Sequence, residues 1–340
     1  MGIRNLHKFL KRHAPHVYKE ISISEYKNKS IAIDINVYLY KYKSLNTNYW
    51  YASFYKLITM LRKYDINCVF VYDTKAPAEK YTKIQERKTK RKQTESKIND
   101  IKEALYQYQT TGAVDRVLTN VMGKRSYSFI PSLLTPSNSV NVPINVETIE
   151  MEISSLQNQI ISVTREDIKL TKTILDYMNI PYFDSDNEAE TMCSHLCCHE
   201  QMDAVLSDDT DVLVYGTPVF LTRLNIMKET VTEIRYQEVI SALCLTPEAF
   251  RDFCILSGTD YNKNIFRIGH EKAYKLLKDY PSIELIHENM NIDVSILNHE
   301  RVREIFSVGP KNSDLNLKCG EPDLAGLALY VVENNLKITI

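Results

Sequence analysis

The stretch 205–215, V-L-S-D-D-T-D-V-L-V-Y, crowds three carboxylates between two apolar runs. The first run has the length and composition of a buried strand, and Asp208, Asp209 and Asp211 follow it. Ligand sites in α/β sheets lie at the carboxyl ends of strands, and crowded carboxylates repel one another unless a cation lies between them. A helix start also favours aspartate, which explains one or two of these residues. Three in so short a stretch favour a metal-ion site.

Two other apolar runs end in the same way. Segment 30–34, S-I-A-I-D, ends at Asp34, and segment 67–73, N-C-V-F-V-Y-D, ends at Asp73. Helical apolar spacing lies between the runs, and strands that alternate with helices indicate a mainly parallel sheet with helices on both faces. We therefore expect these aspartates at the same rim as Asp209. Either one alone could instead cap the following helix.

Glu188 and Glu190 are further candidates, in the segment N-E-A-E-T. Two residues apart, they point about 200° away from each other on a regular helix. They converge on one site only if the helix begins between them, and glutamates at a helix start are also common because of the helix dipole. Asp260 lies in the turn S-G-T-D-Y at 257–261. Together these acids predict a carboxylate cluster built from several segments.

Composition limits the function classes. The chain of 340 residues has a formal net charge of −1, so a nucleic-acid partner must be sought in local cationic patches. Seven irregularly spaced cysteines indicate free thiols and a reducing compartment. No apolar run reaches the length of a membrane span, and the basic N-terminal segment lacks the apolar core of a signal peptide. With nine glycines the chain has no glycine-rich phosphate loop, so side chains must carry the chemistry.

A cationic run follows Asp73, and residues 75–165 are interpreted as an insertion into the sheet, with 123–146 as a mobile loop rich in Ser, Asn and Pro. A charge run is most often a solvated helix face. Directly after a candidate metal ligand, it favours contacts with a phosphate backbone. Four of its cations recur at helical steps: Lys80, Lys83, Arg87 and Arg91.

Taken in order, these motifs resemble the flap endonuclease/XPG family of structure-specific 5′ nucleases. The resemblance covers nearly all of the chain except residues 110–160. It is strong because the motifs recur together and in order, as the following segments show: M-G-I-R-N-L at the start, 31–40, F-V-Y-D-T-K-A-P at 70–77, I-P-Y and E-A-E within 180–190, S-D-D-T-D at 207–211, S-G-T-D-Y at 257–261, 302–306 and 321–327.

The resemblance implies an α/β, PIN-like 5′ nuclease fold with a helical arch insertion and a helix–two-turn–helix element. It implies two Mg²⁺ ions, for which Mn²⁺ can substitute, since both suit an all-carboxylate site. Asp208 stands where a glutamate is usual, outside the ligand set. The implied ligands are Asp34, Asp73, Glu188 and Glu190 for one ion, and Asp209, Asp211 and Asp260 for the other.

The resemblance also implies contacts with DNA. Lys80 and Arg87 match the positions that meet the scissile phosphate, Tyr40 the aromatic that stacks beside the cut, and Gly2 the residue packed near the site. Lys83, Lys90 and Arg91 are expected to bind the phosphate backbone. A turn at 267–269 is expected to hold a duplex phosphate; its Arg267 replaces the usual glycine and precedes Gly269.

The expected activity is a 5′ flap endonuclease and 5′–3′ exonuclease on branched or flapped double-stranded DNA, in replication, repair or recombination. Within a single nuclease domain, the expected regions are 1–74 and 166–257 for the nuclease motifs, 75–165 for the arch and 258–340 for DNA binding. Two alternatives remain: a catalytically silent DNA-junction binder and a related metal-dependent ribonuclease.

Partners and location follow from the same patterns. We expect a monomer with no membrane partner, and no recruitment by the sliding clamp, because no Gln…Phe-Phe segment closes the sequence. The missing segment and the Asn/Lys/Ile/Tyr-rich composition favour a large-DNA-virus homologue. The expected location is intracellular, in the nucleus or, for a viral protein, at a cytoplasmic replication site.

Overall fold

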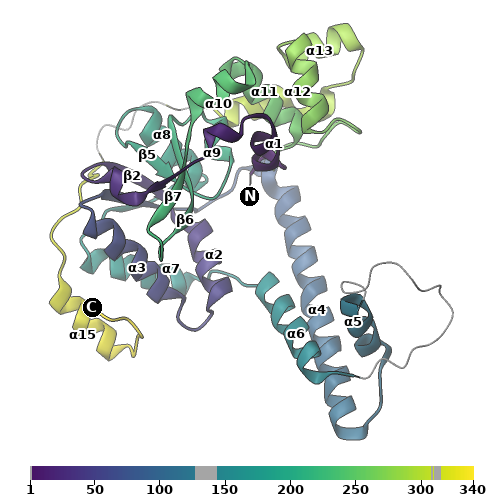
Figure 1. Ribbon diagram of the computed structural model, residues 1–340, viewed down its shortest axis with the longest axis vertical. Helices are drawn as coiled ribbons and strands as arrows, with labels where there is room; N and C mark the ends of the chain where they lie inside the picture. The colour runs from purple at the N-terminus through teal and green to yellow at the C-terminus, as the bar shows by residue number, and fades with distance from the viewer. Residues whose placement is uncertain (1, 127–143, 308, 310–314) are drawn as a thin grey trace. The chain divides into compact units, whose positions relative to one another are not determined.

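The computed structural model describes residues 2–126, 144–307, 309 and 315–340, which form two compact units (Figure 1). The first unit comprises Met1–Tyr81 and Val163–Ile340, and the second comprises Thr82–Ser162. Each unit has hydrophobic clusters of its own. Among the described residues, no helix combines the length and apolar character needed to cross a bilayer.

A seven-stranded sheet forms the centre of the first unit, in the order β1-β7-β6-β5-β2-β3-β4. Neighbours from β6 to β4 pair in parallel, and β7 pairs antiparallel with β6 and β1, so the prediction of a mainly parallel sheet is confirmed. The strands are β1 (Lys19–Ser22), β2 (Ser30–Asp34), β3 (Asn67–Tyr72), β4 (Tyr182–Asp184), β5 (Ala204–Leu206), β6 (Val219–Asn225) and β7 (Thr230–Arg235).

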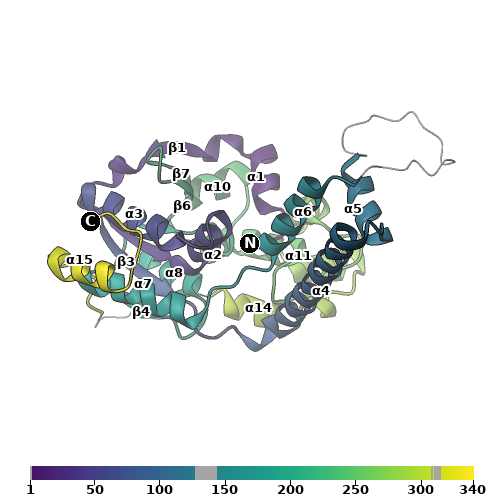
Figure 2. The ribbon, with the colours of Figure 1, turned by 90° about the horizontal axis from the view of Figure 1, so that it is seen from below.

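Helices cover both faces of this sheet (Figure 2), because successive strand residues alternate between two cores. In β2, for example, Ala32 packs on one side while Ile31 and Ile33 pack on the other. On the side of Ala32 lie α1 (Leu6–His13), α8 (Ala189–Cys198), α9 (Asp211–Val214), α10 (Tyr236–Leu243) and α11 (Pro247–Ser257). On the other side lie α2 (Ile35–Leu45), α3 (Trp50–Lys63), α7 (Arg165–Tyr177) and α15 (Leu324–Glu333).

Helices α11 and α12 (His270–Asp279) pack on each other, so a helix pair here begins before residue 258, the expected start of the helix–two-turn–helix region. Thr246 caps α11 by accepting the N–H of Ala249 (3.1 Å), and Pro247 occupies the first turn, where both residue types favour a helix start. Two further helices, α13 (Ile283–Met290) and α14 (His299–Ile305), follow α12. The loop 258–269 between α11 and α12 contains both Asp260 and the turn that was assigned to DNA.

The second unit consists of α4 (Tyr81–Thr111), α5 (Arg116–Ser126) and α6 (Val146–Gln159), packed around a core that includes Ile98, Leu118 and Ile149. The predicted loop 123–146 is wrong at its start, because α5 continues to Ser126. A glycine such as Gly123 weakens a helix by about 1 kcal/mol without ending it. It is also wrong at its end, because α6 begins at Val146, and the part 127–143 lies outside the described residues.

Candidate active site

The sheet brings carboxylates to one rim because β5, β2 and β3 are parallel neighbours. Asp34 ends β2 and lies opposite Val71, two residues before Asp73. Asp209 and Asp211 follow β5 after a short turn. All four carboxylates therefore lie at the carboxyl ends of adjacent strands, where the sequence places them.

Hydrogen bonds hold the turn after β5. The Ser207 hydroxyl donates to Asp34 (2.7 Å) and accepts the backbone N–H of Asp209 (3.0 Å). The Asp209 carboxylate in turn accepts the backbone N–H of Asp211 (3.0 Å), which begins α9. Ser207 thus connects the acids of two strands. Sequence reasoning did not assign it this role, because only the pairing of β2 with β5 brings it to Asp34.

Glu188 and Glu190 reach the rim because α8 begins between them, at Ala189. Glu188 is the extended residue before the helix, and Glu190 lies in its first turn. Asp73 fixes this start by accepting the backbone N–H of Ala189 (2.6 Å). The condition under which the two glutamates can converge is therefore met, and both side chains are buried.

Like charges accumulate in this cluster. Burial raises the pKa values of Asp34, Glu190 and Asp211 well above their usual range, and it raises the pKa of Asp209 as well. Repulsion adds to the effect of burial: Asp73 acts on Asp34, and Asp209 acts on both Glu190 and Asp211. An ionised cluster of this kind requires a positive charge nearby.

Lys80 supplies a positive charge within the cluster. Its ammonium pairs with Glu188, lies 3.8 Å from an oxygen of Asp260 and 5.6 Å from the ring centroid of Tyr261. The Tyr261 hydroxyl donates to Glu188 as well. Burial alone would lower the pKa of Lys80, but the carboxylates of Glu188 and Glu190 outweigh it and hold that pKa above its usual range. The side chain is therefore charged at neutral pH.

The prediction that Lys80 shares a cationic face with Lys83 and Arg87 is wrong. Lys80 ends the short 3₁₀ helix Ala78–Lys80 that precedes α4, and only 8% of it is exposed. Its ammonium is held by Glu188 and lies near Asp260, and the spacing of the cations in the sequence does not reveal these tertiary contacts.

The donors fit hard divalent cations. Every candidate ligand is a carboxylate, and Oδ1 of the buried Asp211 has no hydrogen-bond partner among the residues that the structure describes. In the part of the chain that the structure describes, no three His, Cys, Asp or Glu side chains are arranged closely enough to coordinate one metal ion as they stand. The ammonium of Lys80 lies between Glu188 and Asp260 instead.

Asp208 differs sharply from Asp209 beside it. It accepts hydrogen bonds from Thr222 (3.0 Å), the backbone N–H of Arg223 (2.7 Å) and Lys41 (3.0 Å). Burial raises the pKa of Asp208, but the Arg223 N–H and the Lys41 charge outweigh it and lower that pKa. The Asp208 carboxylate is thus bound by these three donors and is not directed at the carboxylate cluster.

Gly2 lies against the cluster. Its φ is +80°, a conformation that L side chains rarely adopt, and an added Cβ would lie 2.1 Å from Oδ1 of Asp209 and 2.7 Å from Oδ1 of Asp211. Only glycine therefore allows the backbone to approach these two carboxylates.

Comparisons with known proteins agree with this geometry. The XPG N-terminal domain matches residues 1–94, and the XPG I-region matches residues 179–260. A probable RAD2-like endonuclease of invertebrate iridescent virus 3 is 39% identical over 331 residues, which cover 91% of this chain and 86% of the relative. The chain belongs to the XPG/flap endonuclease family. It is accordingly a DNA-binding, structure-specific nuclease, from a family whose members depend on metal ions.

Other members of the XPG/flap endonuclease family align along most of the chain. Flap endonuclease 1 of Scheffersomyces stipitis is 27% identical and covers 98% of this chain and 83% of the relative. The catalytic core of Rad2 in complex with DNA substrate shares the fold with a TM-score of 0.64 at 16% identity, covering 96% of this chain and 94% of that one. Flap endonuclease-1 from Methanococcus jannaschii shares it with a TM-score of 0.60 at 22% identity, covering 93% and 90%. The predictions of family and fold are confirmed.

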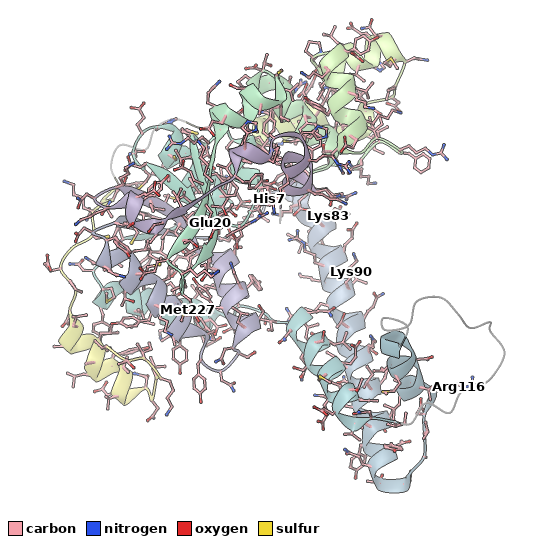
Figure 3. All side chains as sticks on the ribbon, viewed as in Figure 1. His7, Glu20, Lys83, Lys90, Arg116 and Met227 are labelled. Carbon is pink, nitrogen blue, oxygen red and sulfur yellow. The ribbon has the colours of Figure 1, made fainter. Side chains whose placement is uncertain are left out.

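The cations that family resemblance assigns to DNA lie partly in the second unit. Lys83 and Lys90 extend from α4 (Figure 3), and Arg87 and Arg91 lie on the same helix. Lys83 pairs with a glutamate three residues on (2.8 Å), and Arg91 with one four residues on (3.2 Å). Such exposed pairs are weak, so a phosphate can replace the carboxylate.

The remaining residues assigned to DNA are exposed in the first unit. Tyr40 on α2 is 46% exposed. Gly269 precedes α12 with nothing within 4 Å of an added Cβ, and its φ of −110° is open to any residue. Arg267, by contrast, has a φ of +61°, where glycine is favoured.

Proposed function

We propose that this chain hydrolyses DNA phosphodiesters at 5′ flaps and 5′ ends, as an endonuclease and 5′–3′ exonuclease in replication, repair or recombination. The observation that carries the proposal is the set of acids at one rim of the sheet, several of which are buried with raised pKa values. Such a cluster is costly unless cations bind to it. Family membership supports nuclease chemistry there.

Two Mg²⁺ ions are proposed as the cofactors, with Mn²⁺ as a substitute. When bound at such a site, divalent ions lower the pKa of a water molecule and neutralise charge on the phosphate. Asp34, Asp73, Glu188 and Glu190 would hold one ion. Asp209, Asp211 and Asp260 would hold the other.

The protein's own groups supply binding and orientation. Lys80 is protonated at neutral pH, so its ammonium can donate to the scissile phosphate. Tyr261 and Lys80 both hold Glu188, and Asp73 fixes the start of α8, so Glu188 is oriented before substrate arrives. Arg87 is assigned to the same phosphate on the strength of the family resemblance alone.

The test is a panel of labelled substrates: a 5′ flap, a gapped duplex, a bubble and an RNA flap, each with Mg²⁺, Mn²⁺ or a chelator. We expect cleavage near the base of the DNA 5′ flap with either metal and none with the chelator. Binding of the flap without cleavage would instead identify a silent junction binder. Faster cleavage of the RNA flap would identify a ribonuclease.

A further inference from the structure

A strap formed by residues 317–323 leads into α15 and lies along the beginning of β3. Asn67, the first residue of β3, donates from its side-chain amide to the carbonyl of Leu317 (2.7 Å). The same side chain accepts the backbone N–H of Cys319 (2.9 Å). These two bonds place Cys319 beside Cys68, the second residue of the strand.

Further hydrogen bonds continue the strap toward α15. The backbone N–H of Gly320 donates to the carbonyl of Asn179 (2.8 Å), and that of Asp323 donates to the carbonyl of Tyr177 (2.7 Å). The guanidinium of Arg62 on α3 donates to the carbonyl of Gly320 (2.8 Å). The strap therefore determines where α15 begins to pack on the first unit.

Two thiols meet where the strap contacts β3. Sγ of Cys319 accepts the backbone N–H of Cys68 (3.5 Å) and lies 3.3 Å from the carbonyl oxygen of Cys68. Cys68 is buried in the core that lies under α2, α3, α7 and α15, and Cys319 packs against the same core. Both side chains thus lie on one face of the sheet. Cys319 is only partly buried, so it is the member of the pair that solvent can reach.

The two thiols differ in acidity. A hydrogen bond with the Cys68 side chain lowers the pKa of Cys319 to about 6; the backbone N–H of Cys68 and the charge of Arg62 act in the same direction, and burial opposes them. The pKa of Cys68 is raised well above its usual range, first by its hydrogen bond with Cys319 and then by burial. The thiolate is the reactive form of a cysteine. Cys319 is therefore the nucleophile of the pair.

We propose that Cys68 and Cys319 form a reversible redox site, at which a small disulfide such as glutathione disulfide bonds the strap covalently to β3. The Cys319 thiolate attacks one sulfur of the small disulfide, breaks its S–S bond and releases one small thiolate. That thiolate takes the proton of Cys68. The Cys68 sulfur then attacks the Cys319 sulfur, and the second small thiolate leaves. Two protein thiols are thus oxidised while one small disulfide is reduced to two thiols.

This site goes beyond the proposed nuclease function and does not depend on it. Cys68 lies near the beginning of β3, whereas Asp73 follows the end of that strand, so the new bond forms away from the carboxylate rim. The bond closes a loop that contains most of the chain, and closing a long loop removes conformational entropy from the unfolded state. It should also suppress local opening of the strap, which hydrogen exchange in α15 reports.

The test is carried out on the full chain, incubated at pH 7 with glutathione disulfide or with reduced glutathione, then alkylated, digested and analysed by mass spectrometry. We expect a disulfide between Cys68 and Cys319 in the oxidised parent. It should be absent from Cys319→Ser and unchanged in Cys244→Ser, the matched control, because Cys244 is a free and exposed thiol far from the strap in sequence. Cys68→Ser should instead retain glutathione on Cys319.

Two further measurements use the same samples. At pH 6.5 iodoacetamide should alkylate Cys319 about fivefold faster than the more exposed Cys244, because more of Cys319 is thiolate. The oxidised parent should melt about 5 °C above the reduced parent, with slower exchange in α15, and Cys319→Ser should show no such difference.

The proposal is overturned if the parent keeps both thiols in an excess of glutathione disulfide, or if Cys319 of the parent retains glutathione without passing the bond to Cys68. It is also overturned if Cys244 reacts with iodoacetamide faster than Cys319, or if the oxidised parent melts no higher than the reduced parent.

Discussion

The carboxylate rim and the turn 265–268 are charged in opposite senses, and the fold holds them in opposite ways. At the rim, buried acids of like charge are fixed by hydrogen bonds from Ser207 and from the backbone. In the turn, Phe266 and Arg267 are exposed, and only the ends of the turn are anchored. The rim stores electrostatic repulsion, whereas the turn stores backbone strain at one residue.

The rim and the turn therefore favour ligands of opposite charge. The rim favours bound cations, and the exposed guanidinium of Arg267 favours an anion. DNA with bound metal ions would supply both, in line with the proposed function. We therefore expect changes at the rim to alter the rate of DNA cleavage, and changes in the turn to alter the affinity for DNA.

The largest expected effect comes from breaking the rim. Asp211→Asn should slow cleavage of a 5′ flap by at least ~10³-fold while DNA binding is kept or tightened, because a metal ligand is lost and a charge facing the phosphates is removed. Asp208→Asn is the control, since Asp208 is engaged by Lys41 and the backbone of β6. Single-turnover rates at saturating Mg²⁺ decide the matter, and similar rates for both variants would contradict the ligand set.

The next effect concerns the second unit. Arg87→Ala should lower the single-turnover rate about 10²-fold, because a preorganised donor to the phosphate is removed. Lys88→Ala removes a neighbouring exposed cation of α4 and should cost only affinity, with a lower salt slope. A rate for Arg87→Ala within a few-fold of the parent would show that this stretch of α4 is a solvated face.

Lys80 is expected to compete with metal ions at the rim. Its ammonium occupies the cluster, so Lys80→Met should bind Mn²⁺ about tenfold more tightly in the absence of DNA, even as it cleaves more slowly. Lys83→Met, on α4, should leave Mn²⁺ affinity unchanged. Calorimetric titration provides the readout, and weaker or equal Mn²⁺ binding by Lys80→Met would show that the ammonium does not compete with the metal.

The smallest effect is on stability. Acids whose pKa is raised by folding stabilise the protein below their unfolded pKa, and this contribution is lost as pH rises through the folded pKa. With a chelator, the melting temperature should therefore fall as pH rises above the ordinary pKa range of carboxyl groups. Asp211→Asn should melt a few degrees higher than the parent at the upper pH, since about 2–4 °C corresponds to each kcal/mol.

Mg²⁺ should remove most of this pH dependence in the parent. Asp208→Asn should behave in the opposite way and melt lower than the parent, because the pKa of Asp208 is lowered by its partners. A lower melting temperature for Asp211→Asn with the chelator would contradict the repulsion described at the rim.

Strand-end acids could be predicted from the sequence because their positions follow from short-range patterns. Asp34, Asp73 and Asp209 each follow a short apolar run, and parallel pairing then places them together without further information. The helix start at Ala189 was a stated condition rather than a prediction, because two glutamates near a helix start have several explanations. The arrangement of the cluster therefore needed the structure.

Other features depend on tertiary contacts that leave no local trace. Strand β1 is polar and half-exposed, so only its pairing with β7 defines it. Tyr261 reaches Glu188 across the fold, and Lys80 turns inward because a 3₁₀ helix precedes α4. The positive φ of Arg267 likewise cannot be read from the sequence alone. The glycine that is usual at this position in the family is the one indication of it.

Affinity cleavage can show whether the rim binds the divalent ions. Fe²⁺ bound in place of Mg²⁺, with ascorbate and peroxide, generates radicals that cut the backbone near the metal. We expect cuts close to Asp34, Asp73, Glu188–Glu190 and Asp209–Asp211, suppressed by excess Mg²⁺ and reduced in Asp211→Asn. Cuts elsewhere in the chain, or a pattern that Mg²⁺ does not suppress, would contradict it.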